Sequence, residues 1–172
     1  MKNSHNIYKT DRLILRPTNQ KDSKFIFELF NTPSWIRYIG DKGIKTIEDA
    51  ENYIEKHIIS QQNRLGFSTY TLIRQIDNKK IGTCGLYDRD GIDGIDIGFA
   101  LKPEFESMGF AFEASKKIIS ICFNDFKIKS IKAITTPINL ASQKLLLKLG
   151  FKTNGKINLP NNPIEYLSYE LR

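Results

Sequence analysis

Three strand-like stretches follow one another along the chain with only short links between them. The stretches are "FSTYTLIRQI" (67–76), "KIGTCGLY" (80–87) and "IDIGFAL" (95–101), and the links are "DNK" and "DRDGIDG". Because parallel neighbours need a crossover of a dozen or more residues, such links require antiparallel hairpins. This meander argues against a nucleotide-binding domain of alternating strands and helices, and the phosphate motifs GxGxxG and GxxxxGK[ST] do not occur in the sequence.

A first strand and two helices are expected before this meander. "TDRLILRPT" (10–18) alternates in polarity and then meets a proline, which indicates a strand that ends there. Asn19 with Asp22, and Thr46 with Asp49, have the spacing of helix N-terminal capping boxes. Apolar residues at helical spacing follow each pair, so each pair predicts the start of a helix.

The C-terminal part of the chain alternates between helices and strands. The expected elements are a helix over 109–123, a strand over 130–136, a helix over 140–149, and strands near 151–158 and 165–171. The strand at 130–136 is reached across a helix, which favours parallel pairing with the strand at 95–101. The fold class is therefore α+β, with a mixed, mostly antiparallel sheet of seven strands and about four helices.

Length and composition indicate one globular domain spanning residues 1–172. Hydrophobic residues make up 40% of the chain and charged residues 26%, as in an ordinary folded protein. The longest apolar runs, such as "IISICF" (118–123), are too short to cross a bilayer, and "MKNSHNIYKT" (1–10) has no apolar segment of a secretion signal. We expect a cytoplasmic protein that has no membrane partner.

The cysteines, histidines and charges predict neither a metal site nor a nucleic-acid partner. Cys84 and Cys122 lie in separate apolar segments, which favours a role in the core, and His5 and His57 lie near no cluster of metal ligands. The net charge is +7, but the cations are scattered along the sequence and accompany no nucleic-acid motif. The positive charge would suit an anionic cofactor.

A glycine opens the helix expected at 109–123. "KPEFESMGFAFEASKK" (102–117) predicts the end of a strand, a short loop and a helix that begins at Gly109. Uncapped amides at a helix N-terminus can bind phosphates, although the loop carries Glu106 and no Arg, Lys or Gln just before the glycine. A tight turn without any ligand is the alternative interpretation.

Four segments together resemble the GNAT N-acetyltransferase superfamily. They are "TDRLILRP", "IGTCGLYD", "DIGFALKPEFESMGFAFEA" and "NLASQKLLLKLGF", in the order and spacing of the branch that includes ribosomal-protein N-terminal Ala/Ser acetyltransferases. Each motif is weak alone, but the four in register span nearly the whole chain. The resemblance implies a three-layer α/β/α fold with acetyl-CoA as co-substrate, and it allows a homodimer.

The resemblance also implies where the pyrophosphate of coenzyme A would bind. In the family, a loop of the form Gln/Arg-x-x-Gly-x-Gly/Ala wraps it, mostly with main-chain N–H groups. The matching residues here are Met108, Gly109, Phe110 and Ala111, while Glu106 replaces the polar or basic first residue. We expect this loop to bind through its amides and the helix dipole, with Glu106 turned outward and the affinity weakened.

The pantetheine arm would bind beside the fourth family strand. By analogy Phe99, Ala100 and Leu101 supply main-chain groups that pair with it like an added strand, although ordinary strand core is an equally compatible interpretation. Asn139 contacts the pantetheine in the family, and Ser142 lies close to the sulfur. Alternatively, Asn139 only caps its helix and Ser142 is only a polar residue of the first helical turn.

Acetyl transfer needs a deprotonated amine, a stabilised oxyanion and a proton for the departing thiolate. Many relatives use a Tyr as the acid, but Leu146 occupies that position here, so Ser142 is the motif-matched candidate. Asp96 matches the carboxylate that serves relatives as base; its alternative role is to anchor the hairpin. Glu28 and Glu165 are weaker options for the base, with no motif behind them.

The acceptor pocket would lie between the first two helices, the strand at 80–87 and the terminal hairpin. Its candidate aromatic residues are Phe30, Trp35, Tyr38, Tyr87 and Tyr166, most of which we expect in the core, with one or two lining the pocket. The acceptor amine is a protein N-terminus or a small molecule such as an amino acid, a polyamine or an aminoglycoside. A catalytically degenerate domain that binds a CoA thioester or a protein is the alternative function.

Overall fold

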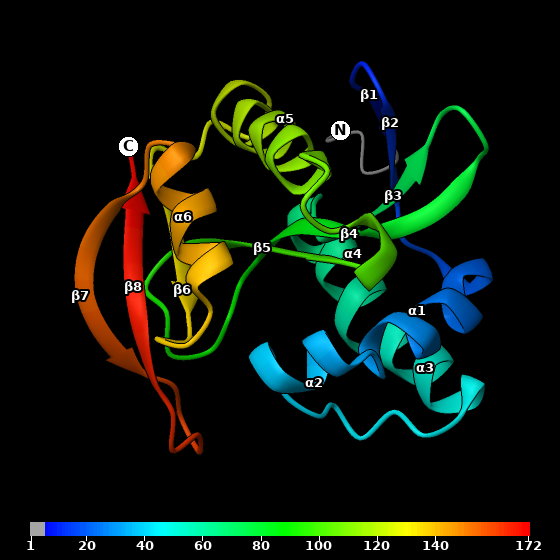
Figure 1. Ribbon diagram of the computed structural model, residues 1–172, viewed down its shortest axis with the longest axis horizontal. Helices are drawn as coiled ribbons and strands as arrows, with labels where there is room; N and C mark the ends of the chain where they lie inside the picture. The colour runs from blue at the N-terminus through cyan, green and yellow to red at the C-terminus, as the bar shows by residue number, and fades with distance from the viewer. Residues whose placement is uncertain (1–5) are drawn as a thin grey trace.

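The computed structural model describes residues 6–172 and contains one mixed sheet (Figure 1). The strands lie in the order β1-β2-β3-β4-β5-β6-β8-β7, and β5 and β6 are the parallel pair. Their bounds are β1 Tyr8–Lys9, β2 Leu13–Pro17, β3 Thr69–Arg74, β4 Lys79–Tyr87, β5 Ile95–Leu101, β6 Ile131–Thr135, β7 Lys152–Asn158 and β8 Glu165–Leu171. The antiparallel meander and the parallel crossover are both as expected. His5 and the first half of the segment 1–10 lie outside the described residues.

The sheet has eight strands rather than the seven expected. Tyr8 and Lys9 pair with Leu15 and Ile14, because the chain turns back at Thr10, whose N–H donates to the Leu13 carbonyl at 2.9 Å. The strand expected within 10–18 is present as β2, and β1 adds the first arm of a hairpin before it. A strand of two residues shows no alternation in polarity, so its pattern was not visible in the sequence.

Five helical bodies accompany the sheet in the described part of the chain, one more than expected. Their elements are η1 Gln20–Asp22 with α1 Ser23–Phe30, α2 Pro33–Tyr38, a continuous helix of α3 Ile47–Tyr53, η2 Ile54–Ile59 and α4 Ser60–Leu65, then α5 Phe110–Asn124 and α6 Leu140–Lys148. A single 3-10 turn, η3 Pro103–Phe105, precedes α5. The additional helix is α2, which forms because Thr32 accepts a hydrogen bond from the Trp35 N–H and Pro33 occupies its first position.

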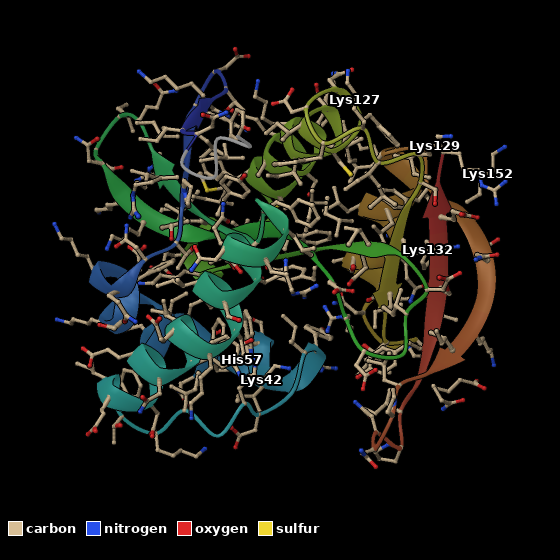
Figure 2. The ribbon with its side chains drawn as sticks, turned by 180° about the vertical axis from the view of Figure 1, so that it is seen from behind. Lys42, His57, Lys127, Lys129, Lys132 and Lys152 are labelled. Carbon is tan, nitrogen blue, oxygen red and sulfur yellow. The ribbon has the colours of Figure 1, made fainter. Side chains whose placement is uncertain are left out.

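Both predicted capping boxes are present. Asn19 and Asp22 form the first, at the start of η1, and Thr46 and Asp49 form the second, at the start of α3. Figures 1 and 2 view the molecule from opposite sides and show α5 on one face of the sheet and α4 on the other. The fold class is thus the expected one, with helices on both faces.

The buried apolar side chains form two clusters. One packs the sheet against α5 and α6, and both Cys84 and Cys122 lie within it as expected. The other joins α1, α2, α3 and η2, and the Ala100 side chain of β5 packs against it. Because β5 reaches both clusters, its backbone is fixed from two sides where it passes between them.

Candidate active site

The parallel strands β5 and β6 separate soon after they begin. Only Ile95 and Asp96 of β5 pair with β6, opposite Ile131 and Lys132, while β5 pairs with β4 from Asp96 to Leu101. Beyond Asp96, one edge of β5 is therefore open. Unpaired main-chain groups at such an edge can bind an extended ligand as an added strand.

The register shows which main-chain groups face this edge. The Lys102 N–H donates to the Ile81 carbonyl at 2.8 Å, and hydrogen-bonded pairs alternate along an antiparallel ladder. Ala100 therefore directs its N–H and C=O toward β4, whereas Phe99 and Leu101 direct theirs toward the opening. Of the three predicted pantetheine-binding residues, Phe99 and Leu101 have main-chain N–H and C=O groups that face the opening, and Ala100 does not.

A cavity of about 790 Å³ occupies the opening and continues between α2, η2, α5 and α6. It brings together most of the residues predicted from the sequence. Those that line it are Asp96, Phe99, Ala100, Leu101, Gly109, Ala111, Asn139 and Ser142. Met108 and Phe110 do not line it: Met108 is half exposed and Phe110 belongs to the core. For these two residues only the main-chain N–H groups remain candidates.

The helix α5 begins with uncapped amides. Gly109 has φ 82°, a left-handed conformation that glycine adopts without strain, and no side chain caps the helix at this residue. The first N–H groups of an α-helix have no partner within the helix, so this N-terminus can accept an anion. Glu106 is exposed to solvent and also borders the cavity.

Two cations approach this loop from other parts of the chain. Arg12 pairs with Glu113 at 2.7 Å, donates to the Met108 carbonyl at 3.0 Å and lies over the Phe110 ring at 4.3 Å. It does not line the cavity, so it holds the loop in place from outside. Arg12 and the residues it contacts here are about a hundred positions apart in the sequence. A motif of neighbouring residues therefore could not indicate these contacts.

The second cation, Lys148 at the end of α6, does line the cavity. Its Nζ lies 4.6 Å from the centre of the Phe112 ring, in the first turn of α5. Sequence reasoning missed Lys148 because it looked for a cation within the loop itself. A positive charge here can compensate for the acidic residue at the start of the loop.

Asn139 is the N-cap of α6, and Ser142 lies in the first turn of this helix. The Ser142 N–H donates to Oδ1 of Asn139 at 3.1 Å, so Asn139 does cap α6. Within residues 6–172 neither the Asn139 amide nitrogen nor the Ser142 hydroxyl has a hydrogen-bond partner, and both residues line the cavity. Leu146, where relatives carry a Tyr, is buried in the cavity wall.

Asp96 is buried at the end of the paired part of β5. Its side chain is 1% exposed and lies 3.2 Å from Nη2 of Arg89, with Nε of Arg89 also within 3.3 Å. Burial raises the pKa of Asp96 to about 6, although the nearby guanidinium acts in the opposite direction. The carboxylate thus changes charge close to neutral pH, as a base for an ammonium group requires.

The other candidate bases lie outside the cavity. Glu28 pairs with Lys102 at 2.7 Å, and Glu165 pairs with Lys156 at 2.6 Å; both carboxylates are largely exposed. Neither residue lines the cavity that contains Asp96. They therefore have no access to an amine bound there.

All five predicted aromatic residues line the cavity, more than the one or two expected. Three of them are also buried: Phe30 and Trp35, which stack at 3.8 Å between ring centres, and Tyr166. Tyr38 and Tyr87 are the other two predicted residues. Tyr53 and His57, whose ring centres are 4.7 Å apart, also line the cavity, although no motif indicated them. They come from α1, α2, α3, η2, β4 and β8, which only the fold brings together.

Three further features of residues 6–172 concern metal ligands, thiols and helix length. No group of three or more His, Cys, Asp or Glu side chains in residues 6–172 is arranged to hold a metal ion. Burial raises the pKa of both Cys84 and Cys122 to about 12, and neither thiol lines the cavity, so neither is an activated nucleophile. None of the described helices is long and apolar enough to cross a membrane.

Known proteins resemble the chain in both sequence and fold. The family model described as Acetyltransferase (GNAT) domain matches residues 12–152. The uncharacterized N-acetyltransferase YoaA of Bacillus subtilis is 33% identical over 150 residues, which cover 87% of this chain and 84% of that protein.

Two solved structures illustrate the similarity of fold. A GNAT-family acetyltransferase from Bacillus anthracis superposes with a TM-score of 0.79 at 24% identity, covering 96% of this chain and 98% of that one. RimL, a ribosomal L7/L12 alpha-N-protein acetyltransferase solved in complex with coenzyme A, superposes with a TM-score of 0.82 at 15% identity, covering 96% and 97%.

Proposed function

The chain belongs to the acetyltransferase (GNAT) family, and we propose that it transfers the acetyl group of acetyl-CoA to a primary amine by direct attack in a ternary complex. Family and fold are those expected from the sequence. One observation carries the proposal: the open edge of β5 and the uncapped N-terminus of α5 lie on the same cavity. We further propose that residues 1–172 form a single domain.

The cavity has groups that fit each part of acetyl-CoA. The pantetheine arm would pair with the main chain of Phe99 and Leu101, beside Ala100, and contact the free amide nitrogen of Asn139. The pyrophosphate would bind the N–H groups of residues 108–111, and Lys148 on the cavity wall, whose Nζ lies over the Phe112 ring of the first turn of α5, would add a positive charge. RimL, which shares the fold and was solved in complex with coenzyme A, supports this placement by analogy.

Asp96 would accept a proton, and Ser142 would stabilise the leaving group. Bound acetyl-CoA supplies a thioester carbonyl that a neutral amine can attack. Asp96 accepts the proton of the incoming ammonium through water, because its pKa lies near 6 and Arg89 fixes its position. The Ser142 hydroxyl, which has no partner in the described chain, donates a hydrogen bond to the departing thiolate.

The acceptor is a protein N-terminus or a small amine. The acceptor half of the cavity is lined with aromatic side chains and opens to solvent, which suits an amine carried on a larger group. The fold shared with a ribosomal-protein acetyltransferase makes peptide N-termini the first acceptors to test. Free amino acids, polyamines and aminoglycosides form the rest of the panel.

Two measurements test the proposal. Acetyl-CoA should raise the melting temperature, and free thiol should then appear with one or more amines of the panel. Ser142→Ala should lower kcat and leave the melting-temperature shift intact, whereas Gln143→Ala, the next residue of α6, should retain kcat. The buried Leu146 in place of a tyrosine favours the alternative, a CoA-binding domain without catalysis. A thermal shift without thiol release on any amine would support that alternative.

A further inference from the structure

The charged side chains in the acceptor half of the cavity are mostly positive. This half is bounded by η2, α4, the loop 39–46 and the loop 88–94 between β4 and β5. Its charged residues are Lys42, Lys56, Arg64, Asp88, Arg89 and Asp96. Four of these carry a positive charge and two a negative charge at neutral pH, so the wall is cationic before any substrate binds.

The two acids are already paired with the two arginines. Arg64 pairs with Asp88 at 2.8 Å, and Arg89 pairs with Asp96 at 3.2 Å. Lys42 and Lys56 remain, and neither has an ion pair or hydrogen bond to any of residues 6–172. The excess positive charge of the wall therefore resides on two lysines that the protein leaves without a counter-ion.

Lys42, an exposed residue, lines the same half of the cavity as the positively charged Arg89. Desolvation lowers the pKa of Lys42, and repulsion from Arg89 lowers it further. The nearest acid in the sequence, Asp41, is directed elsewhere: it binds Lys45 at 2.8 Å and the Gly43 N–H at 2.7 Å. The loop thus presents a cation to the cavity and keeps its own carboxylate away from it.

We propose that the acceptor amine carries a carboxylate that binds beside Lys42 and Lys56, so that the substrate is an amino acid or a peptide N-terminus with an acidic side chain. The inference rests on the proposed acetyl transfer and specifies its acceptor. An anion at this position relieves the repulsion between Lys42 and Arg89, whereas a polyamine would add positive charge to it. Selection against the wrong acceptor comes from the same lysines that bind the right one.

The geometry also orients such a substrate. Arg89 pairs with Asp96, and its charge also acts on Lys42, which lines the same half of the cavity. The amine would approach Asp96 and the carboxylate would approach Lys42. Figure 2 shows Lys42 and His57 on the same side of the molecule, away from Lys127, Lys129 and Lys152 at the opposite end.

A panel of matched acceptors tests this inference. C-terminally amidated peptides that begin Ala-Glu-Glu, Ala-Gln-Gln and Ala-Lys-Lys place acidic, neutral and basic side chains after the same N-terminal residue. Alanine and alaninamide form a second pair, in which only alanine has a carboxylate. This pair tests whether the carboxylate of a free amino acid is recognised. At saturating acetyl-CoA we expect kcat/KM for an acidic member to exceed that of its neutral partner by about tenfold, and to fall with added salt. Spermidine and the basic peptide should react most slowly.

Variants at the two lysines give the decisive comparison. Lys42→Gln and Lys56→Gln should each reduce the preference for the acidic acceptor, measured as its kcat/KM divided by that of the neutral acceptor, by about threefold to tenfold. Lys42→Glu should favour the basic peptide, and Lys42→Arg should retain the original preference. Lys129→Gln is the matched control, because it removes the same charge at the far end of the molecule (Figure 2).

Failure of this inference can be distinguished from failure of acetyl transfer. If acetyl transfer is equally fast with acidic, neutral and basic acceptors, or fastest with spermidine, the inference is wrong. The proposed acetyl-transfer activity is then still supported. If no amine releases thiol, binding of the acidic and neutral peptides is compared by calorimetry in the presence of coenzyme A. An acidic preference that Lys42→Gln removes then supports the inference, and its absence overturns it.

Discussion

At the scale of single residues, the proposed base Asp96 predicts how activity depends on pH. A base must be ionised to accept a proton, and the pKa of Asp96 is raised to about 6 by burial. We therefore expect kcat/KM to rise with pH through about 6 and to be lost below it. Asp96→Asn should lower kcat by about a hundredfold and abolish this limb of the profile.

The control for this prediction is Asp93→Asn in the loop that follows β4, a residue that does not line the cavity. Both variants remove one carboxylate from the same hairpin, but only Asp96 lies beside Arg89. If Asp96→Asn retains more than about a third of the activity at high pH, Asp96 has only a structural role.

Trp35 provides a test of an unsatisfied polar group. Its indole Nε1 is buried and has no hydrogen-bond partner among the described residues, while its ring stacks on Phe30. Trp35→Phe keeps a ring and removes the unpaired N–H, so the free energy of unfolding should stay within about 1 kcal/mol or increase. Trp35→Ala should lose about 3–5 kcal/mol because it leaves a cavity.

Urea unfolding of the two Trp35 variants measures both values. A loss of more than about 2 kcal/mol in Trp35→Phe would indicate that the indole N–H does make a stabilising hydrogen bond or that the smaller ring packs poorly. Unfolding of Tyr38→Phe, which alters an aromatic residue of the same helix, serves as the comparison.

At the scale of elements, the N-terminus of α5 depends on a left-handed glycine. Gly109 has φ 82°, and a Cβ at this position would come within 3.3 Å of Arg12. Gly109→Ala should lower the free energy of unfolding by about 1–2 kcal/mol and also weaken acetyl-CoA binding, because the loop must shift. Calorimetry and urea unfolding measure the two effects separately.

Gly155 is the matched control for this substitution. It has φ 78° in β7, and a Cβ there would meet nothing within 4 Å. Gly155→Ala should therefore lose similar stability and keep its affinity for acetyl-CoA. Equal affinity losses in both variants would contradict a binding role for the α5 N-terminus.

The end of α6 contributes a charge to the same loop. Lys148→Gln should raise the KM for acetyl-CoA several-fold, with a smaller effect at high salt, because Lys148 lies on the cavity wall beside the first turn of α5. Lys144, one turn earlier, does not line the cavity, so Lys144→Gln should leave the KM unchanged. Steady-state kinetics at two ionic strengths measure the KM of both variants. If Lys148→Gln and Lys144→Gln have the same KM for acetyl-CoA, Lys148 has no role in binding it.

At the scale of the whole molecule, the two apolar clusters should unfold together, since β5 contacts both. The chain contains one tryptophan, Trp35, and it lies in the helical cluster. Its fluorescence therefore reports that cluster, while far-UV circular dichroism reports all helices and strands. We expect coincident transitions by the two probes, and an earlier fluorescence change would instead divide the chain into separate folding units.

The fold also arranges charges that the sequence leaves scattered. Lys132 and Lys152 lie on the strands either side of β8, both opposite Glu170, and Lys132 pairs with it at 3.0 Å. Figure 2 shows these lysines with Lys127 and Lys129 along one edge of the molecule. Some of the positive charge of the chain therefore gathers along this edge, although the lysines are scattered in the sequence.

The sequence by itself determined the features that depend on residues a few positions apart. The capping pairs Asn19–Asp22 and Thr46–Asp49, the two short hairpin links and the glycine before α5 were all predicted, because a local hydrogen bond or a backbone dihedral decides each of them. The motif-matched residues of the cavity were predicted by resemblance to a family.

Only the tertiary structure decided the contacts between distant segments. The extra strand β1, the brace from Arg12 to the loop before α5, and the approach of Lys42 to Arg89 join positions that no sequence pattern relates. These contacts depend on where the sheet and the helices place each segment in space. Local patterns therefore predicted most of the fold and the family resemblance supplied the candidate site residues, whereas the unpaired lysines on the cavity wall became visible only in the tertiary structure.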